Sequence, residues 1–179
     1  GIGGGIYSVG NLTLNSSTVS GNSAGNGGGL MNFLGTATLT LNSSTVSGNT
    51  VAGGAGGIHN FGGTVTLNSS TVNGNSAADG GGIYNTGTLT LNSSTVSNNT
   101  AASNGGGIFN SGGTATLTLN NSTVSSNTAM AGGGIVNAGT LTLTNTTVSN
   151  NSATCGGGIY NVGAGSLDAN GSTVSGNTA

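Results

Sequence analysis

The sequence predicts an all-β protein, a parallel β-helix in which about seven turns each contain three short strands. Three motifs predict this fold, because each recurs seven times and their order never changes. The first is Thr-Val within Ser-Thr-Val or Thr-Thr-Val, and the second is Gly-Gly followed by an aliphatic residue. Thr-Leu-Thr-Leu, or a close variant, lies between them. A flexible Gly/Ser linker has no such period.

The spacing of the repeat sets the length of each turn. Successive copies of the Thr-Val motif are separated by 27, 26, 24, 28, 24 and 26 residues. We therefore expect turns of 24–28 residues and a single repeat array over residues 1–179. Strands of neighbouring turns lie roughly 4.8 Å apart, so seven turns make a rod about 34 Å long.

One turn shows how each strand is predicted. Polar and apolar residues alternate over 88–91 and again over 94–97, with the period of two that a strand imposes. A shorter strand over 82–85 follows a run of glycines, which tolerate the backbone angles of a corner. The alternation points one apolar row inward. For this turn the predicted core is Ile83, Leu89, Leu91 and Val96, with Ala101 at the corner.

The composition excludes several classes of function. The chain contains no Lys or Arg and only two acidic residues, Asp79 and Asp168. A nucleic-acid partner is excluded because no cation is present to neutralise phosphates. No apolar run reaches the roughly 18 residues that a membrane span needs, so we expect no membrane insertion. We also expect no enzyme activity and no cofactor, since most catalysis depends on charged or titratable groups.

Asparagines form two columns of the repeat. In a parallel stack, equivalent amides lie above one another and can form a hydrogen-bonded ladder. The first column, three residues after each Val, is the predicted structural ladder: Asn22, Asn49, Asn75, Asn99, Asn127, Asn151 and Asn177. The second column lies two residues after the aliphatic anchor: Asn32, Asn60, Asn85, Asn110, Asn137 and Asn161, with Ser8 in the first turn.

The pattern from Gly80 to Ala101 carries a family resemblance. It resembles the repeats of secreted right-handed parallel β-helix proteins, including bacterial surface adhesins and autotransporter passengers of the polymorphic outer-membrane-protein type. The resemblance implies a right-handed coil and an extracellular or cell-surface setting. Pectate-lyase-like enzymes share this fold class, but their sites use acidic clusters with Arg or Lys, so their activity is not implied here.

The few chemically reactive residues are scattered. His59 lies in a variable column with Tyr7, Tyr84 and Tyr160, which we interpret as a surface stripe. Nothing in the spacing brings His59 together with Asp79 or Asp168 as a catalytic triad would require. One His, one Cys and two Asp in four different repeats do not form a metal site. We expect the lone Cys155 to be a small buried residue, with an interchain disulfide as the alternative. Eleven Asn-x-Ser/Thr triplets are mostly one repeat position copied, and they indicate glycosylation only weakly.

The ends of the sequence suggest self-association. Joining Ala179 to Gly1 of another copy preserves the repeat, so we expect either a longer array or copies stacked head to tail by parallel β-augmentation. Leu167, Ala169 and Val174 would then continue the columns of Leu12, Leu14 and Val19, and Asn177 would extend the ladder to Asn22. The leading hypothesis is a non-enzymatic extracellular structural protein, a fibre or a segment of a surface stalk or adhesin.

The alternative hypothesis is an ice-binding surface. The outward residues of the Thr-Leu-Thr-Leu strands form a two-column array that resembles the Thr-x-Thr face of ice-binding β-solenoids, although Asn11 and Asp168 interrupt it at the two ends. A glycan-binding surface on the tyrosine column is a weaker possibility. The array consists of Thr38, Thr40, Thr64, Thr66, Thr88, Thr90, Thr116, Thr118, Thr140 and Thr142.

Overall fold

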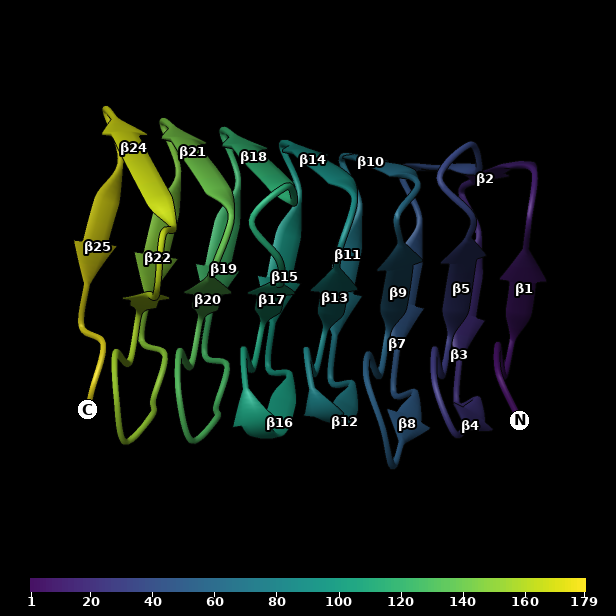
Figure 1. Ribbon diagram of the computed structural model, residues 1–179, viewed down its shortest axis with the longest axis horizontal. Helices are drawn as coiled ribbons and strands as arrows, with labels where there is room; N and C mark the ends of the chain where they lie inside the picture. Colours follow the sequence, from purple (N-terminus) through teal and green to yellow (C-terminus); the bar gives the residue numbers. More distant parts are fainter.

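The computed structural model describes all 179 residues and shows a right-handed parallel β-solenoid of seven turns (Figure 1). The turns follow one another along the rod, with the two termini at opposite ends. This confirms the predicted fold class. No helix is long and apolar enough to cross a membrane.

Three seven-stranded parallel sheets run the length of the rod, as predicted. The isoleucine sheet contains β1 (Ile6–Ser8), β5 (Leu30–Phe33), β9 (Ile58–Phe61), β13 (Ile83–Asn85), β17 (Ile108–Asn110), β20 (Ile135–Asn137) and β23 (Ile159–Asn161). The leucine sheet contains β2 (Asn11–Asn15), β6 (Thr38–Asn42), β10 (Thr64–Asn68), β14 (Thr88–Asn92), β18 (Thr116–Asn120), β21 (Thr140–Thr144) and β24 (Ser166–Asn170). The valine sheet contains β3 (Thr18–Ser20), β7 (Thr45–Ser47), β11 (Thr71–Asn73), β15 (Thr95–Ser97), β19 (Thr123–Ser125), β22 (Thr147–Ser149) and β25 (Thr173–Ser175).

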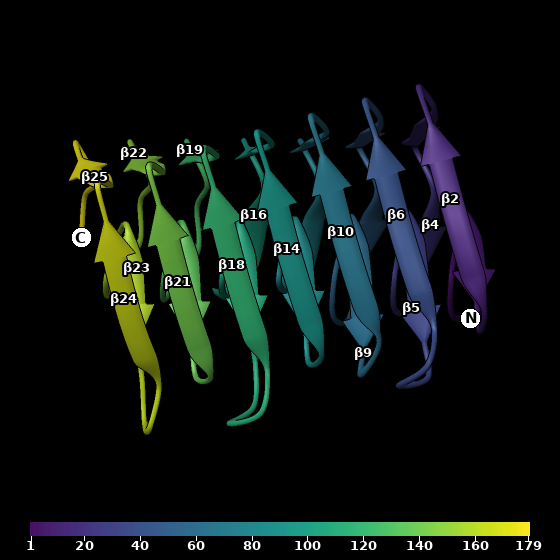
Figure 2. The ribbon, with the colours of Figure 1, turned by 90° about the horizontal axis from the view of Figure 1, so that it is seen from above.

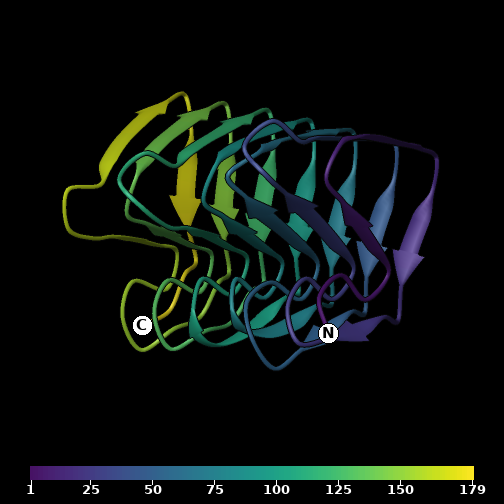
Figure 3. The same ribbon diagram turned by 45° about the vertical axis from the view of Figure 1, so that its right-hand side comes forward.

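A fourth, shorter sheet was not predicted. It contains β4 (Ser23–Ala24), β8 (Thr50–Val51), β12 (Ser76–Asp79) and β16 (Thr100–Asn104), and single bridges continue it from Thr100 through Thr128 and Ser152 to Thr178. Here the chain forms a small second coil beside the main one (Figure 3).

The glycine corner closes the main coil at this point. A Cβ on Gly56 would lie 2.7 Å from both the backbone nitrogen and the carbonyl oxygen of Ser76, and 2.6 Å from the carbonyl oxygen of Gly81. Only a residue without a side chain allows two backbones to approach so closely. The glycine runs are therefore required for packing as well as for turning.

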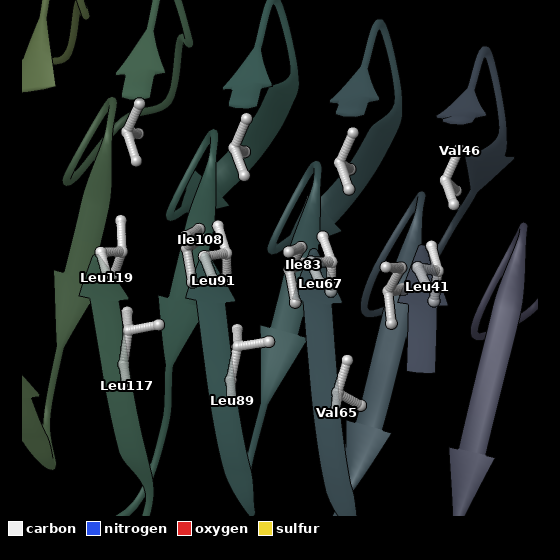
Figure 4. Packing of buried hydrophobic residues seen from close by; sticks show 14 of the residues in the cluster. Leu41, Val46, Val65, Leu67, Ile83, Leu89, Leu91, Ile108, Leu117 and Leu119 are labelled. Atoms are coloured by element: carbon white, nitrogen blue, oxygen red, sulfur yellow. The ribbon is translucent and has the colours of Figure 1, made fainter. Parts of the chain in front are cut away.

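The core is a stack of identical aliphatic columns (Figure 4). In the fourth turn Ile83, Leu89, Leu91 and Val96 are fully buried, and Ala101 is buried at the corner, as predicted. Strand pairing places like residues in register, for instance Leu89 on Leu117 and Val96 on Val124. Each turn thus buries its apolar row against its neighbours, and stability accumulates along the rod.

Turn length varies at only two of the corners. The interval from the leucine sheet to the valine sheet is seven residues in every turn, for example from Leu89 to Val96. By contrast, the interval from the isoleucine sheet to the leucine sheet ranges from six residues, Ile83 to Leu89, to nine residues, Leu30 to Leu39. The constant corner contains a left-handed Ser or Asn in six turns, such as Ser93 with φ of 49°.

Candidate functional site

The first asparagine column forms an unbroken ladder through the rod. In each of the six steps, Nδ2 of one Asn donates to Oδ1 of the Asn in the next turn at 2.9–3.0 Å. The same Oδ1 also accepts from the preceding turn's Asn backbone N–H at 2.9–3.0 Å. From Asn49 onward, the second Nδ2 proton goes to a Val carbonyl of the previous turn. Each inner amide therefore joins three consecutive turns.

The second column forms a parallel ladder at the corner between the isoleucine and leucine sheets. Its five Nδ2 to Oδ1 hydrogen bonds run from Asn32 to Asn161 and measure 2.7–2.9 Å. These amides also donate to backbone carbonyls of the variable corner, as Asn60 does to Gly63. Both ladders are structural, since a buried amide is stable only when its donors and acceptors are paired.

Two further ladders were missed by the sequence reasoning. In the valine-side corner, Ser Oγ accepts from the backbone N–H of the Ser one turn earlier at 3.0–3.1 Å from Ser17 to Ser122, and Thr146 and Ser172 continue the column. An outer Asn column runs from Asn15 to Asn120, with each amide donating back to the turn before. The signal for both was present in the repeated Asn-Ser-Ser that follows Thr-Leu-Thr-Leu.

The ten threonines of the candidate ice-binding array lie on β6, β10, β14, β18 and β21 of the leucine sheet (Figure 2), where they alternate with buried Leu or Val and so face outward. Strand pairing aligns them in two columns, for example Thr88 with Thr116 and Thr90 with Thr118. The column of Thr40, Thr66, Thr90, Thr118 and Thr142 is only partly exposed. Asn11 and Thr13 continue the columns at one end, and Ser166 and Asp168 at the other. Hydroxyl groups therefore line most of the face, and Asn11 and Asp168 interrupt them at its two ends.

The outer face of the isoleucine sheet differs from the rest of the surface because it is apolar. One column is Tyr7, Met31, His59, Tyr84, Phe109, Val136 and Tyr160. A second column beside it begins with Phe33 and Phe61, which pair directly. Rings of neighbouring turns are in contact, with centroids 5.0 Å apart for Phe33 and Phe61 and for Tyr84 and Phe109.

Interpreting His59 as part of an exposed surface stripe was wrong. The side chain is only 8% exposed, and Met31 and Val136 of the same column are also buried. The His59 ring packs against Tyr84 and Phe61, with centroids 5.0 and 6.0 Å away. Both ring nitrogens lack a hydrogen-bond partner. Burial lowers the pKa of His59 from 6.5 to about 4, because the charged imidazolium would lose its hydration.

The other reactive residues form no hydrogen bond with His59. Asp79, in β12, accepts hydrogen bonds from the backbone and side chain of Asn104. Asp168, in β24, pairs with Thr142 and accepts from Asn170. The expectation that Cys155 is buried was wrong, since this cysteine is free and exposed. It lies in one bridge column with Ala131 and Asn104.

The fold defines a repeat protein of the parallel β-solenoid class, and one family matches two of its turns. Residues 93–111 and 145–162 match the Chlamydia polymorphic membrane protein (Chlamydia_PMP) repeat. Each matched segment runs from the valine sheet across the glycine corner to the isoleucine sheet, and so includes Asn99 or Asn151 of the first ladder. No curated protein and no solved structure matches the chain.

Proposed function

We propose that this solenoid is a non-enzymatic rod in an extracellular, cell-surface protein, where it serves as a stalk or as the passenger of an adhesin. The observation that carries the proposal is the match of two turns to the repeat of a membrane-protein family, in a chain whose seven turns form one continuous rod. Support also comes from the absence of basic residues, since a rod without cationic side chains attracts neither nucleic acid nor anionic lipid.

The ladders suit a mechanical role. Every inner turn is joined to both neighbours by backbone hydrogen bonds of the sheets, by hydrogen bonds between asparagine side-chain amides and by contacts between aliphatic side chains. Since each turn contacts only its neighbours, a rod of this kind can span distance without a large globular core.

Surface labelling of intact cells tests the location. An antibody against the folded rod should label unpermeabilised cells that express the full protein, and brief protease treatment of those cells should remove the signal. Labelling that requires permeabilisation would contradict the surface assignment. An unrelated periplasmic protein serves as the control for membrane integrity.

We further propose that the end turns pair with another turn of the same kind, whether in the same chain or in a second copy. Val174 is 55% exposed and Leu167 is also exposed, although their columns are buried elsewhere in the rod. The ladder is complementary as well, because Asn177 has a free Nδ2 proton and Asn22 has a free Oδ1. Parallel pairing would satisfy both groups.

Sedimentation of the 179-residue chain tests pairing between copies. Head-to-tail pairing propagates, so the mean mass should rise with concentration without stopping at a dimer. Val174→Asp or Leu12→Asp would bury an unpaired charge at the junction and should abolish this rise. Circular dichroism must show that the variants are folded. Folded variants that associate as well as the parent would contradict pairing at these ends.

A further inference from the structure

Large apolar side chains form an aromatic patch on the outer surface of the first three turns. It consists of Tyr7, Val9, Phe33, Leu34 and Phe61, from β1, β5, β9 and the corners after β1 and β5. Val9 is 52% exposed and Phe61 49%. Later turns have Thr86 and Ser111 at the position of Phe61, so the patch ends there.

The rings of the patch form a row along the rod. The centroids of Tyr7 and Phe33 are 5.7 Å apart, and those of Phe33 and Phe61 are 5.0 Å apart with nearly parallel planes. Consecutive rings come from consecutive turns of a rigid stack. The row is therefore held in place before any partner arrives, which lowers the entropic cost of binding.

Leu34 adds an apolar side chain to the patch at a position where the backbone conformation is unfavourable for any residue except glycine. Its φ is 92°, a region in which a bulky side chain is strained. The equivalent residues of two other turns are glycines, Gly62 with φ of 81° and Gly112 with φ of 100°. Replacing glycine here strains the backbone and adds an exposed apolar side chain beside Phe33. Strain of this kind is typical of functional positions.

The charge and the size of the patch restrict its partner. The chain has no Lys or Arg, and its two acids lie elsewhere, in β12 and β24. Half-exposed side chains of about 200 Å² each leave a patch on the order of 400 Å². A stable protein interface needs about 800 Å² from each partner. A second copy or a protein partner is therefore a poor fit.

We propose that the aromatic patch binds a neutral, linear oligosaccharide that lies along the rod. Phe33 and Phe61 stack on each other, so the C–H groups of successive sugar rings can pack against the outer edges of this row and against Val9 and Leu34 beside it. The surrounding surface offers only hydroxyl and amide groups, which match the uncharged donors and acceptors of a neutral sugar. This binding site does not depend on the cellular location proposed above.

NMR titration with cellohexaose, maltohexaose and chitohexaose tests the site. At least one of them should shift the amide signals of Tyr7, Phe33 and Phe61 at millimolar concentration. Phe61→Thr, which copies Thr86, should weaken that binding at least about tenfold. Leu34→Gly, which copies Gly62, should also weaken it while leaving the urea midpoint no lower than that of the parent. Phe109→Val, which copies Val136 outside the patch, is the matched control and should bind normally.

Three results would overturn the proposal. One is that none of the three sugars shifts these signals. Another is binding that survives unchanged in Phe61→Thr. The last is evidence for a different partner, either a dimer in sedimentation or retention on phosphatidylcholine vesicles. That result counts against the proposal if Phe61→Thr abolishes the association and added sugars do not affect it.

Discussion

The side-chain amide of Asn99 donates at 3.0 Å to Oδ1 of Asn127, one turn further along the chain. The other proton of the same amide goes back to the Val72 carbonyl, also at 3.0 Å. Its Oδ1 accepts from the backbone and the side chain of Asn75. One buried side chain thus holds three turns in register, and it offers the most direct test of how the rod is stabilised.

Asn99→Ala should destabilise the rod by about 4 kcal/mol, because several buried polar groups lose their partners at 1–3 kcal/mol each. Asn22→Ala is the matched control, since Asn22 contacts a neighbouring turn on one side only and is partly exposed. We expect it to cost about 1 kcal/mol. Urea denaturation followed by circular dichroism measures both. Equal losses for the two variants would show that the inner ladder adds nothing to backbone pairing.

Gly82→Ala should prevent close packing of the glycine corner. An added Cβ would lie 2.6 Å from the Gly107 carbonyl oxygen and 2.9 Å from Asn99 Nδ2. The loss should exceed about 2 kcal/mol, within the range for overpacked sites. At Gly113 nothing lies within 4 Å of the added atom, so Gly113→Ala should be neutral or stabilise the fold by about 0.5 kcal/mol. Thermal melting compares the pair, and a tolerated Gly82→Ala would refute the close-packing requirement.

His59 should make the stability of the rod depend on pH. Because burial lowers its folded-state pKa to about 4, the unfolded chain binds the proton more readily between pH 6.5 and 4. The contribution of the neutral ring is complete above about pH 6.5 and is lost as the pH falls towards 4, with a total loss of roughly 3 kcal/mol.

Urea midpoints measured across this pH range test the assignment. His59→Met, which copies Met31 of the same column, should remove the loss between pH 6.5 and 4. If the variant and the parent lose stability equally, the pH dependence comes from other groups.

Cys155 should react with a thiol reagent in the folded state, because it is free and exposed. One equivalent of Ellman's reagent should be consumed at the same rate with and without urea, within a few-fold. Val148→Cys, placed in the buried core, is the control and should react only after unfolding. Slow reaction of native Cys155 would restore the original expectation of a buried thiol.

The sequence was sufficient to predict the columns. Parallel pairing in register places each residue above its equivalent, so a residue type repeated at Val96 or Asn99 has the same environment in every inner turn. Period and alternation therefore predicted the three main sheets, the core and the alignment of the threonines. The serine and outer asparagine ladders follow the same logic, but Asn92 lay just outside the predicted strand 88–91, Ser94 was placed at the start of the strand 94–97, and hydrogen bonds were considered for neither side chain.

The path of the chain between columns could not be predicted. The small second coil depends on how closely the backbones of Gly56 and Ser76 approach, which no local pattern encodes. Burial of His59 depends on contacts with Tyr84 and Phe61 on the outer face of a sheet. Alternation identifies that face as outward, and it does not reveal that large side chains there cover one another.

The corner between the isoleucine and leucine sheets can vary in length without changing how the turns stack. It changes from six to nine residues between Ile83–Leu89 and Leu30–Leu39, yet the leucine strands remain in register on both sides. An insertion at this corner would therefore project sideways and leave the repeat undisturbed. The scaffold can therefore acquire a new surface loop in any one turn without changes to the others. The nine-residue corner that contains Leu34 is already such a loop.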